Sequence, residues 1–191
     1  MITTVAVDLD QLNFRVERSG EAAVVSDVVA RSFGDQHVAD LMDGLRASTA
    51  WIDGLSFVAD LDGEVFGQVL FTRGILDAPR RLVEVLVLSP VGIVTEYRGQ
   101  GIGSALIRHA LGIVGQRSEP LVFLEGSPDY YPRFGFEAGG LHGFRRPSLR
   151  IPEPAFQVLR LPSHQAWMTG TLVYPQVFWD LDSVGLRDPN A

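Results

Sequence analysis

The sequence has no cysteine and no lysine. The absence of cysteine excludes disulfides, thiolate metal sites and a cysteine nucleophile. The absence of lysine makes all 16 basic side chains arginine and excludes a catalytic lysine. No window reaches about 18 uninterrupted apolar residues, the length of a transmembrane helix, and the N-terminus lacks the basic segment and apolar run of a secretory signal. We therefore expect a cytoplasmic protein.

What the chain does contain is typical of an ordered globular protein. Of its 191 residues, 46% are hydrophobic and 20% are charged, which suits a domain with a substantial core. The net charge of −7 argues against a general nucleic-acid binder, which would carry a basic face, and is compatible with cationic substrates such as amines. No His, Asp or Glu cluster has the spacing of metal ligands, so we expect no metal.

The apolar pattern predicts a mixed α/β fold. Strands are expected over 13–18, 55–61, 64–73, 80–91, 120–125, 155–161 and 171–178, and helices over 20–33, 36–47, 102–114 and 129–134. The Asp62-Gly63 pair between two apolar runs predicts a hairpin. The strand–helix–strand unit over 83–125 predicts one parallel strand pair in the sheet. We expect a single domain, 1–191, with a loose leader over 1–12, an extended loop over 139–154 and a C-terminal extension over 170–191.

The stretch over 83–111 organises the rest of the chain. Its branched apolar residues predict a strand buried on both faces, which ends near Ser89-Pro90. After the Gly-rich turn over 98–103 the apolar residues adopt helical spacing, and we expect this stripe to face the core: Ile102, Ala105, Leu106, Ala110, Ile113 and Val114. The glycines leave backbone amides uncovered where the helix begins, which predicts an anion site and favours phosphate.

Known phosphate-binding turns and a purely structural turn compete to explain this stretch. A dinucleotide turn has the pattern G-x-G-x-x-G, but Leu106 stands where its third glycine would be. A nucleotide-triphosphate loop needs a lysine, which the chain lacks. The glycines could also serve only a tight strand-to-helix turn.

Two motifs resemble those of the GCN5-related N-acetyltransferases (GNAT). The sequence RGQGIG at 98–103, after VGIV at 91–94, resembles their Q/R-x-x-G-x-G/A signature, and YPRFGF at 131–136 resembles their Y-x-x-x-G-F. The order of predicted elements is also similar over about residues 13–178. The segment GSPDYYPRFGF at 126–136 is most similar to a subgroup of uncharacterised predicted acetyltransferases.

The resemblance implies a GNAT-like fold: a mixed, mostly antiparallel sheet with one parallel, splayed strand pair and helices on both faces. It also implies acetyl-CoA as the acyl donor, with its pyrophosphate on the backbone amides of the turn and its thioester carbonyl polarised by backbone amides of the splayed strand. The residues matching these places are Gly92, Ile93, Val94, Arg98, Gly99, Gln100, Gly101, Ile102, Gly103 and Ser104.

Acid–base chemistry needs further side chains. Tyr131 matches the family's general-acid tyrosine, and a phenol with a pKa near 10 stays protonated at neutral pH; core packing is the alternative, and Tyr130 could exchange roles with it. Glu84 and Glu125 are the preferred candidates for the general base, beside Asp129 and His142. Glu84 lies among valines, where a carboxylate is costly to bury unless it faces a cleft or a partner. Each could instead be a paired or solvated carboxylate.

These residues predict an N-acetyltransferase in which a primary amine attacks the bound thioester directly in a ternary complex. The alternative is an acetyl-CoA-binding sensor or regulatory module without turnover. We expect the acceptor to be a small-molecule or peptide amine and not nucleic acid or membrane, and the C-terminal strands suit a homodimer. The sequence does not identify the acceptor.

Overall fold

The computed structural model describes residues 6–187, which fall into two compact units. One unit comprises the chain up to Phe71 together with Ser89–Gln116, and the other comprises Thr72–Leu88 together with the chain from Arg117 onward. Strands β3 (Glu64–Asp77) and β4 (Leu82–Ile93) contribute residues to both units. No helix in the described range is long and apolar enough to cross a membrane.

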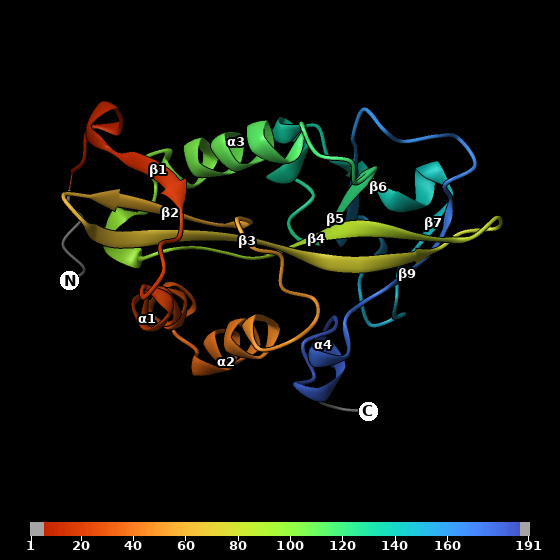
Figure 1. Ribbon diagram of the computed structural model, residues 1–191, viewed down its shortest axis with the longest axis horizontal. Helices are drawn as coiled ribbons and strands as arrows, with labels where there is room; N and C mark the ends of the chain where they lie inside the picture. Colours follow the sequence, from red (N-terminus) through yellow and green to blue (C-terminus); the bar gives the residue numbers. More distant parts are fainter. Residues whose placement is uncertain (1–5, 188–191) are drawn as a thin grey trace. The chain divides into compact units, whose positions relative to one another are not determined.

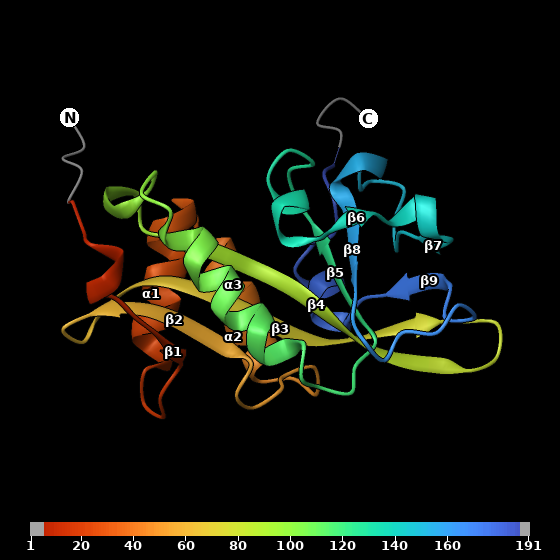
Figure 2. The same cartoon turned by 90° about the horizontal axis from the view of Figure 1, so that it is seen from above.

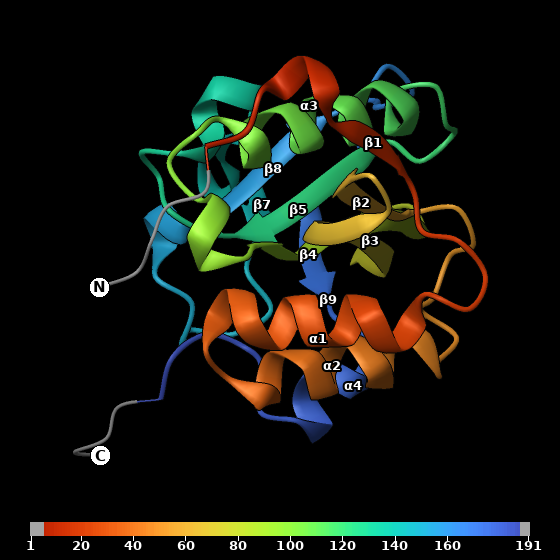
Figure 3. The same cartoon turned by 90° about the vertical axis from the view of Figure 1, so that its left-hand side faces the viewer.

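The first unit is a small antiparallel sheet with helices on both faces. Strand β1 (Asn13–Val16) pairs with β2 (Ser56–Leu61), and β2 pairs with β3. The predicted β2–β3 hairpin is confirmed, because Asp62 and Gly63 have φ of 52° and 88°, the positive values that a tight two-residue turn requires. Helices α1 (Ala22–Phe33) and α2 (Gln36–Arg46) cover one face and α3 (Ile102–Val114) covers the other (Figures 1 and 3).

Local signals set the ends of these helices. Helix α1 ends at Gly34, whose φ of 65° is left-handed, and the Asp35 side chain then accepts a hydrogen bond from the His37 amide to cap α2. Helix α3 buries Ile102, Leu106, Ile107, Ala110 and Val114. The predicted stripe was wrong at two positions: Ala105 is only half-buried and Ile113 is 37% exposed, whereas Ile107, which was not predicted, is in the core.

The second unit contains the predicted parallel pair, β4 with β5 (Leu121–Glu125), in register at Leu86 and Val122 (Figure 2). Strand β8 (Phe156–Arg160) pairs antiparallel with β5 and with the short β6 (Glu137–Ala138). Strand β9 (Gly170–Val173) pairs antiparallel with β3. A second parallel contact, between β7 (Phe144–Arg145) and β9, was not predicted.

The expected strand over 171–178 is wrong in its second half. Strand β9 ends at Val173, Pro175 starts a new turn, and α4 (Gln176–Asp180) follows. Proline cannot continue a ladder but suits a helix start, and the rings of Tyr174 and Phe178, four residues apart, stack at 4.8 Å.

Short 3₁₀ helices lie in the segments predicted as leader, short helix and loop, and one more precedes the Gly-rich turn. They are η1 (Leu9–Gln11), η2 (Thr95–Tyr97), η3 (Tyr131–Phe134), η4 (Gly139–His142) and η5 (Glu153–Ala155). The predicted helix over 129–134 is therefore a single 3₁₀ turn that starts two residues later.

Candidate functional site

The Gly-rich turn of the first unit lies between η2 and α3. Gly99 and Gly101 have φ of 78° and 84°, so both need the left-handed conformation that glycine tolerates best. Among the described residues, a Cβ on Gly99 would meet no atom within 4 Å, and one on Gly101 only the Leu9 Cδ1 at 3.7 Å. No side chain within residues 6–187 caps α3. The start of the helix therefore has room for a ligand and the positive end of a helix dipole to hold an anion.

Arg98 fixes this turn to its surroundings. Its Nε donates to the Ile93 carbonyl at 2.9 Å, and its Nη2 donates to the Ser32 carbonyl. Ser32 lies in the last turn of α1, where helix carbonyls carry partial negative charge. The resemblance placed Arg98 among the cofactor-binding residues, and both of these guanidinium contacts are with backbone carbonyls. These two contacts fix the position of the guanidinium beside the turn.

At the end of β4, the backbone amide of Ile93 is better placed to donate to a ligand than those of Gly92 and Val94. The Val94 amide already donates to the Phe66 carbonyl on β3 at 2.9 Å. Because successive residues of a strand direct their amides to opposite edges, the Ile93 amide faces the edge away from β3. Gly92 has a packing role, since a Cβ there would lie 2.8 Å from the Ser32 Cβ. Of the three residues predicted to polarise the thioester carbonyl, Ile93 is therefore the one whose backbone amide points away from β3 and could donate to a ligand.

The other predicted residues of the turn contribute in different ways. The Ile102 side chain is buried, so only its backbone could meet a ligand. Gly103 and Ser104 lie in the first turn of α3, the predicted anion site. The Gln100 Oε1 accepts a hydrogen bond from the Val7 amide at 2.9 Å, which joins the segment before η1 to the turn.

Tyr131 of the second unit begins η3 and is packed on one side by a glycine. A Cβ on Gly126 would lie 2.2 Å from the Tyr131 Cε2, so the ring needs a residue without a side chain there. Gln157 holds this loop in place by donating from Nε2 to the Gly126 carbonyl at 3.1 Å. Burial and the neighbouring Tyr130 raise the pKa of Tyr131 to about 12. The phenol is therefore protonated throughout the neutral range.

Glu125 ends β5 and is tied to the C-terminal segment. It accepts hydrogen bonds from the Gly185 amide, at 3.1 Å, and from the Tyr174 hydroxyl. Burial raises the pKa of Glu125, and these bonds and the nearby Arg150 only partly oppose that rise. The carboxyl is thus held in place and more basic than an ordinary glutamate.

The other base candidates lie in less suggestive surroundings. Glu84 is half exposed and forms an ion pair with Arg73 at 2.9 Å, so its partner explains a carboxylate between valines. His142 contacts Glu137 at 3.1 Å, and Asp129 is exposed. Among the described residues no three His, Asp or Glu side chains group to hold a metal ion.

The sequence did not single out Gly126, Tyr174 or Gly185 as residues that position Tyr131 and Glu125. Gly126 had a detectable signal, since it follows a buried strand directly. The partners of Glu125 are about 50 and 60 residues further along the chain, and no local pattern marks them.

Comparisons with known proteins point to an acetyltransferase family. The profile of an acetyltransferase (GNAT) domain matches residues 14–139. The chain is 33% identical over 145 residues to the uncharacterized N-acetyltransferase YjhQ of Escherichia coli, covering 73% of this chain and 77% of the relative. It is 31% identical over 167 residues to the uncharacterized N-acetyltransferase YhbS of the same organism, covering 86% and 96%.

Solved structures give the same result. The crystal structure of E. coli YhbS in complex with CoA matches with a TM-score of 0.78 and 30% identity, covering 88% of this chain and 92% of that one. A GNAT family acetyltransferase from Brucella melitensis in complex with acetyl-CoA matches with a TM-score of 0.70 and 28% identity, covering 87% and 97%.

Proposed function

Because the chain belongs to the GNAT family of acetyltransferases, we propose that it transfers an acetyl group from acetyl-CoA to a primary amine by direct attack in a ternary complex. The observation that carries this proposal is the glycine-lined start of α3, where open space meets the positive end of a helix. Relatives crystallised with CoA and acetyl-CoA support the choice of donor. We retain 1–191 as one acetyltransferase domain.

The turn is assigned to donor binding. Backbone amides over 99–104 hold the pyrophosphate, and Arg98 keeps the turn in shape through its two carbonyl contacts. Acetyl-CoA, when bound, supplies the acetyl group as an activated thioester. The Ile93 amide is assigned to the carbonyl oxygen of that group, where one well-placed donor contributes about 3 kcal/mol.

Tyr131 is assigned to proton donation. Its hydroxyl keeps its hydrogen at neutral pH, because burial raises its pKa to about 12. A thiol has a pKa of about 8.5, well below that of Tyr131, so the phenolate would tend to take the proton back from the thiol. The proton therefore stays on the sulfur only if the phenol regains a proton from elsewhere. The attacking amine loses one proton to the base as the amide forms, and the release of that proton from the base restores the phenol, so that in net terms one proton leaves the amine and one reaches the thiol.

Glu125 is assigned to removal of that proton from the acceptor. Its raised pKa makes it a better base than an exposed carboxylate, and its two hydrogen bonds fix its position. Glu84 is the weaker candidate, since its ion pair with Arg73 is typical of a solvated strand face. The cytoplasmic location, the homodimer and the absence of a metal stay predictions from the sequence.

The experiment that tests this function measures free thiol released from acetyl-CoA over a panel of primary amines. We expect amine-dependent release with formation of the acetylated amine. Binding of acetyl-CoA with no thiol release for any amine would favour the alternative, a sensor module without turnover.

A further inference from the structure

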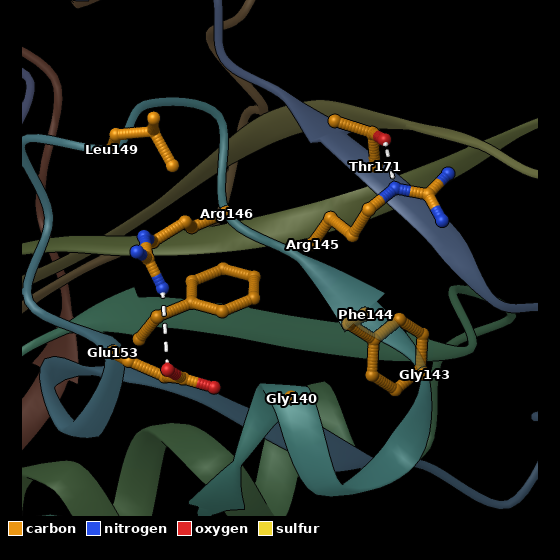
Figure 4. A pocket seen from close by; sticks show the side chains of 9 residues that line it. Gly140, Gly143, Phe144, Arg145, Arg146, Leu149, Glu153 and Thr171 are labelled. Atoms are coloured by element: carbon orange, nitrogen blue, oxygen red, sulfur yellow. Dashed lines mark hydrogen bonds and ion pairs between the residues drawn. The ribbon is translucent and has the colours of Figure 1, made fainter.

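A pocket in the second unit has a composition that the proposed chemistry leaves unexplained. It has a volume of about 500 Å³ and lies between β7, β9, η4 and the loop before η5 (Figure 4). That volume is in the range of small-molecule sites. Its walls combine two arginines and one glutamate with aromatic rings, a mixture suited to an organic ion.

The apolar floor of the pocket is fixed by packing. Phe144 and Phe156 are 3% and 2% exposed, and both rings contact Phe123, with centroid distances of 5.1 and 5.5 Å. Gly139 allows this arrangement, because a Cβ there would lie 2.6 Å from the Phe156 ring. Leu149 at the rim is 88% exposed and adds apolar surface.

The charged side chains of the pocket, Arg145, Arg146 and Glu153, leave one arginine nitrogen without a hydrogen-bond acceptor among the described residues. Arg146 and Glu153 face each other across the pocket (Figure 4), but their closest charged atoms are 3.8 Å apart and the Glu153 side chain is 72% exposed. The Arg146 Nε is buried and meets no hydrogen-bond acceptor in the described part of the chain. Arg145 is held by its Nε donating to the Thr171 Oγ1 at 2.9 Å. The lining of the pocket thus includes two arginines and one glutamate, in a chain with net charge −7.

We propose that this pocket binds the carboxylate of the acceptor, so that the substrate is a primary amine carrying a carboxylate and an apolar body. The inference rests on the proposed function. Arg146 pairs with the carboxylate through its planar fork, and the apolar body packs against the exposed Leu149 above the floor of buried rings. The surplus of one positive charge matches a monoanion better than a phosphate dianion.

The sheet connects the pocket to the assigned base. Phe156 on β8 is the cross-strand partner of Glu125 on β5. Directly paired residues of an antiparallel ladder project to the same face as neighbours. The floor of the pocket therefore neighbours Glu125 on the sheet, and in this proposal the acceptor places its carboxylate in the pocket and directs its amine toward Glu125.

Matched acceptors test the proposal: 4-(2-aminoethyl)benzoate and its neutral benzamide, with the wild-type chain and Arg146→Gln. We expect the wild type to have a KM about tenfold lower for the benzoate, as expected for a charged hydrogen bond, and Arg146→Gln to abolish that preference with an unchanged KM for acetyl-CoA. Arg160→Gln is the matched control, since Arg160 pairs with Glu137 outside the pocket. Equal KM values for both amines in the wild type, or a preference that survives in Arg146→Gln, would overturn the proposal.

Binding without turnover separates this proposal from the acetyltransferase assignment. By calorimetry, 4-ethylbenzoate should bind the wild type and lose about tenfold in affinity in Arg146→Gln, whose thermal unfolding checks its fold. Such binding without any acetyl transfer would refute the proposed function alone. No binding of 4-ethylbenzoate, alongside transfer to neutral amines, would refute the pocket alone. Tighter binding of 4-ethylphenyl phosphate would overturn the choice of a carboxylate.

Discussion

The donor turn of the first unit and the Tyr131–Glu125 region of the second are built from different materials. The turn is defined by backbone, since glycines with positive φ and a helix start form the binding surface. The Tyr131–Glu125 region is defined by side chains, since a half-buried phenol packs against Gly126 and a half-buried carboxyl is held by Gly185, 60 residues further along the chain. A site built from backbone can be recognised in the sequence, because few residues except glycine adopt the positive φ that it requires. A side-chain site depends on packing that the sequence does not display.

The largest expected effect comes from a substitution in the donor turn that leaves the Tyr131–Glu125 region unchanged. Gly101→Glu places a side chain at φ 84° and a carboxylate at the assigned pyrophosphate site, so acetyl-CoA affinity should fall by more than about 100-fold. Calorimetric titration measures it. Gly112→Glu, which adds the same charge near the other end of α3 where a Cβ meets nothing within 4 Å, should keep wild-type affinity.

The next effect breaks the chemistry of the second unit. Tyr131→Phe removes the hydroxyl and keeps the ring, so kcat for thiol release should fall by about 100-fold, the lower range for loss of a general acid. Tyr130→Phe is the matched control in the neighbouring ring and should stay near the wild-type rate. A Tyr131→Phe enzyme with full kcat would leave core packing as the role of this ring.

A backbone change in the second unit sharpens the comparison. Gly126→Ala would bring a Cβ to 2.2 Å from the Tyr131 ring, and overpacking of this kind costs about 1–3 kcal/mol of unfolding free energy. Denaturant unfolding measures the loss, and kcat should fall with it because the phenol moves. Gly112→Ala, with open space around its Cβ, should leave stability unchanged or slightly raised. A fully stable Gly126→Ala protein would contradict the packing described for Tyr131.

The smallest expected effect concerns the pH dependence of stability. Burial raises the folded-state pKa of Glu125 above its ordinary value of 4.5. Its contribution is therefore fully present below that value and is lost as pH rises through the folded pKa. Relative to Glu125→Gln, the wild type should lose unfolding free energy over this rise, as measured by urea titrations at several pH values. A constant difference between the two proteins across that window would contradict a raised pKa.

Most of the fold follows from the sequence, because periodicity and glycine turns are local signals. The hairpin at Asp62-Gly63 and the parallel β4–β5 pair are confirmed. The failures have tertiary causes. Tyr174 and Phe178 stack on each other in a helical turn, and the segment follows this packing rather than strand alternation.

The candidate site likewise has features that follow from the sequence and others that depend on tertiary contacts. The open space and dihedral angles at Gly99 and Gly101 fit the sequence motif. The contacts of Arg98 with carbonyls, the engagement of the Val94 amide by β3 and the ion pair of Glu84 depend on which elements meet in space. No spacing rule contains that information.

The most direct test of the central claim, that donor binding belongs to the turn and proton transfer to Tyr131, is one calorimetric series with acetyl-CoA. We expect one-site binding with equal Kd for the wild type and Tyr131→Phe, and an affinity lowered by more than about 100-fold for Gly101→Glu. Wild-type affinity in Gly101→Glu, or lost affinity in a folded Tyr131→Phe protein, would contradict it.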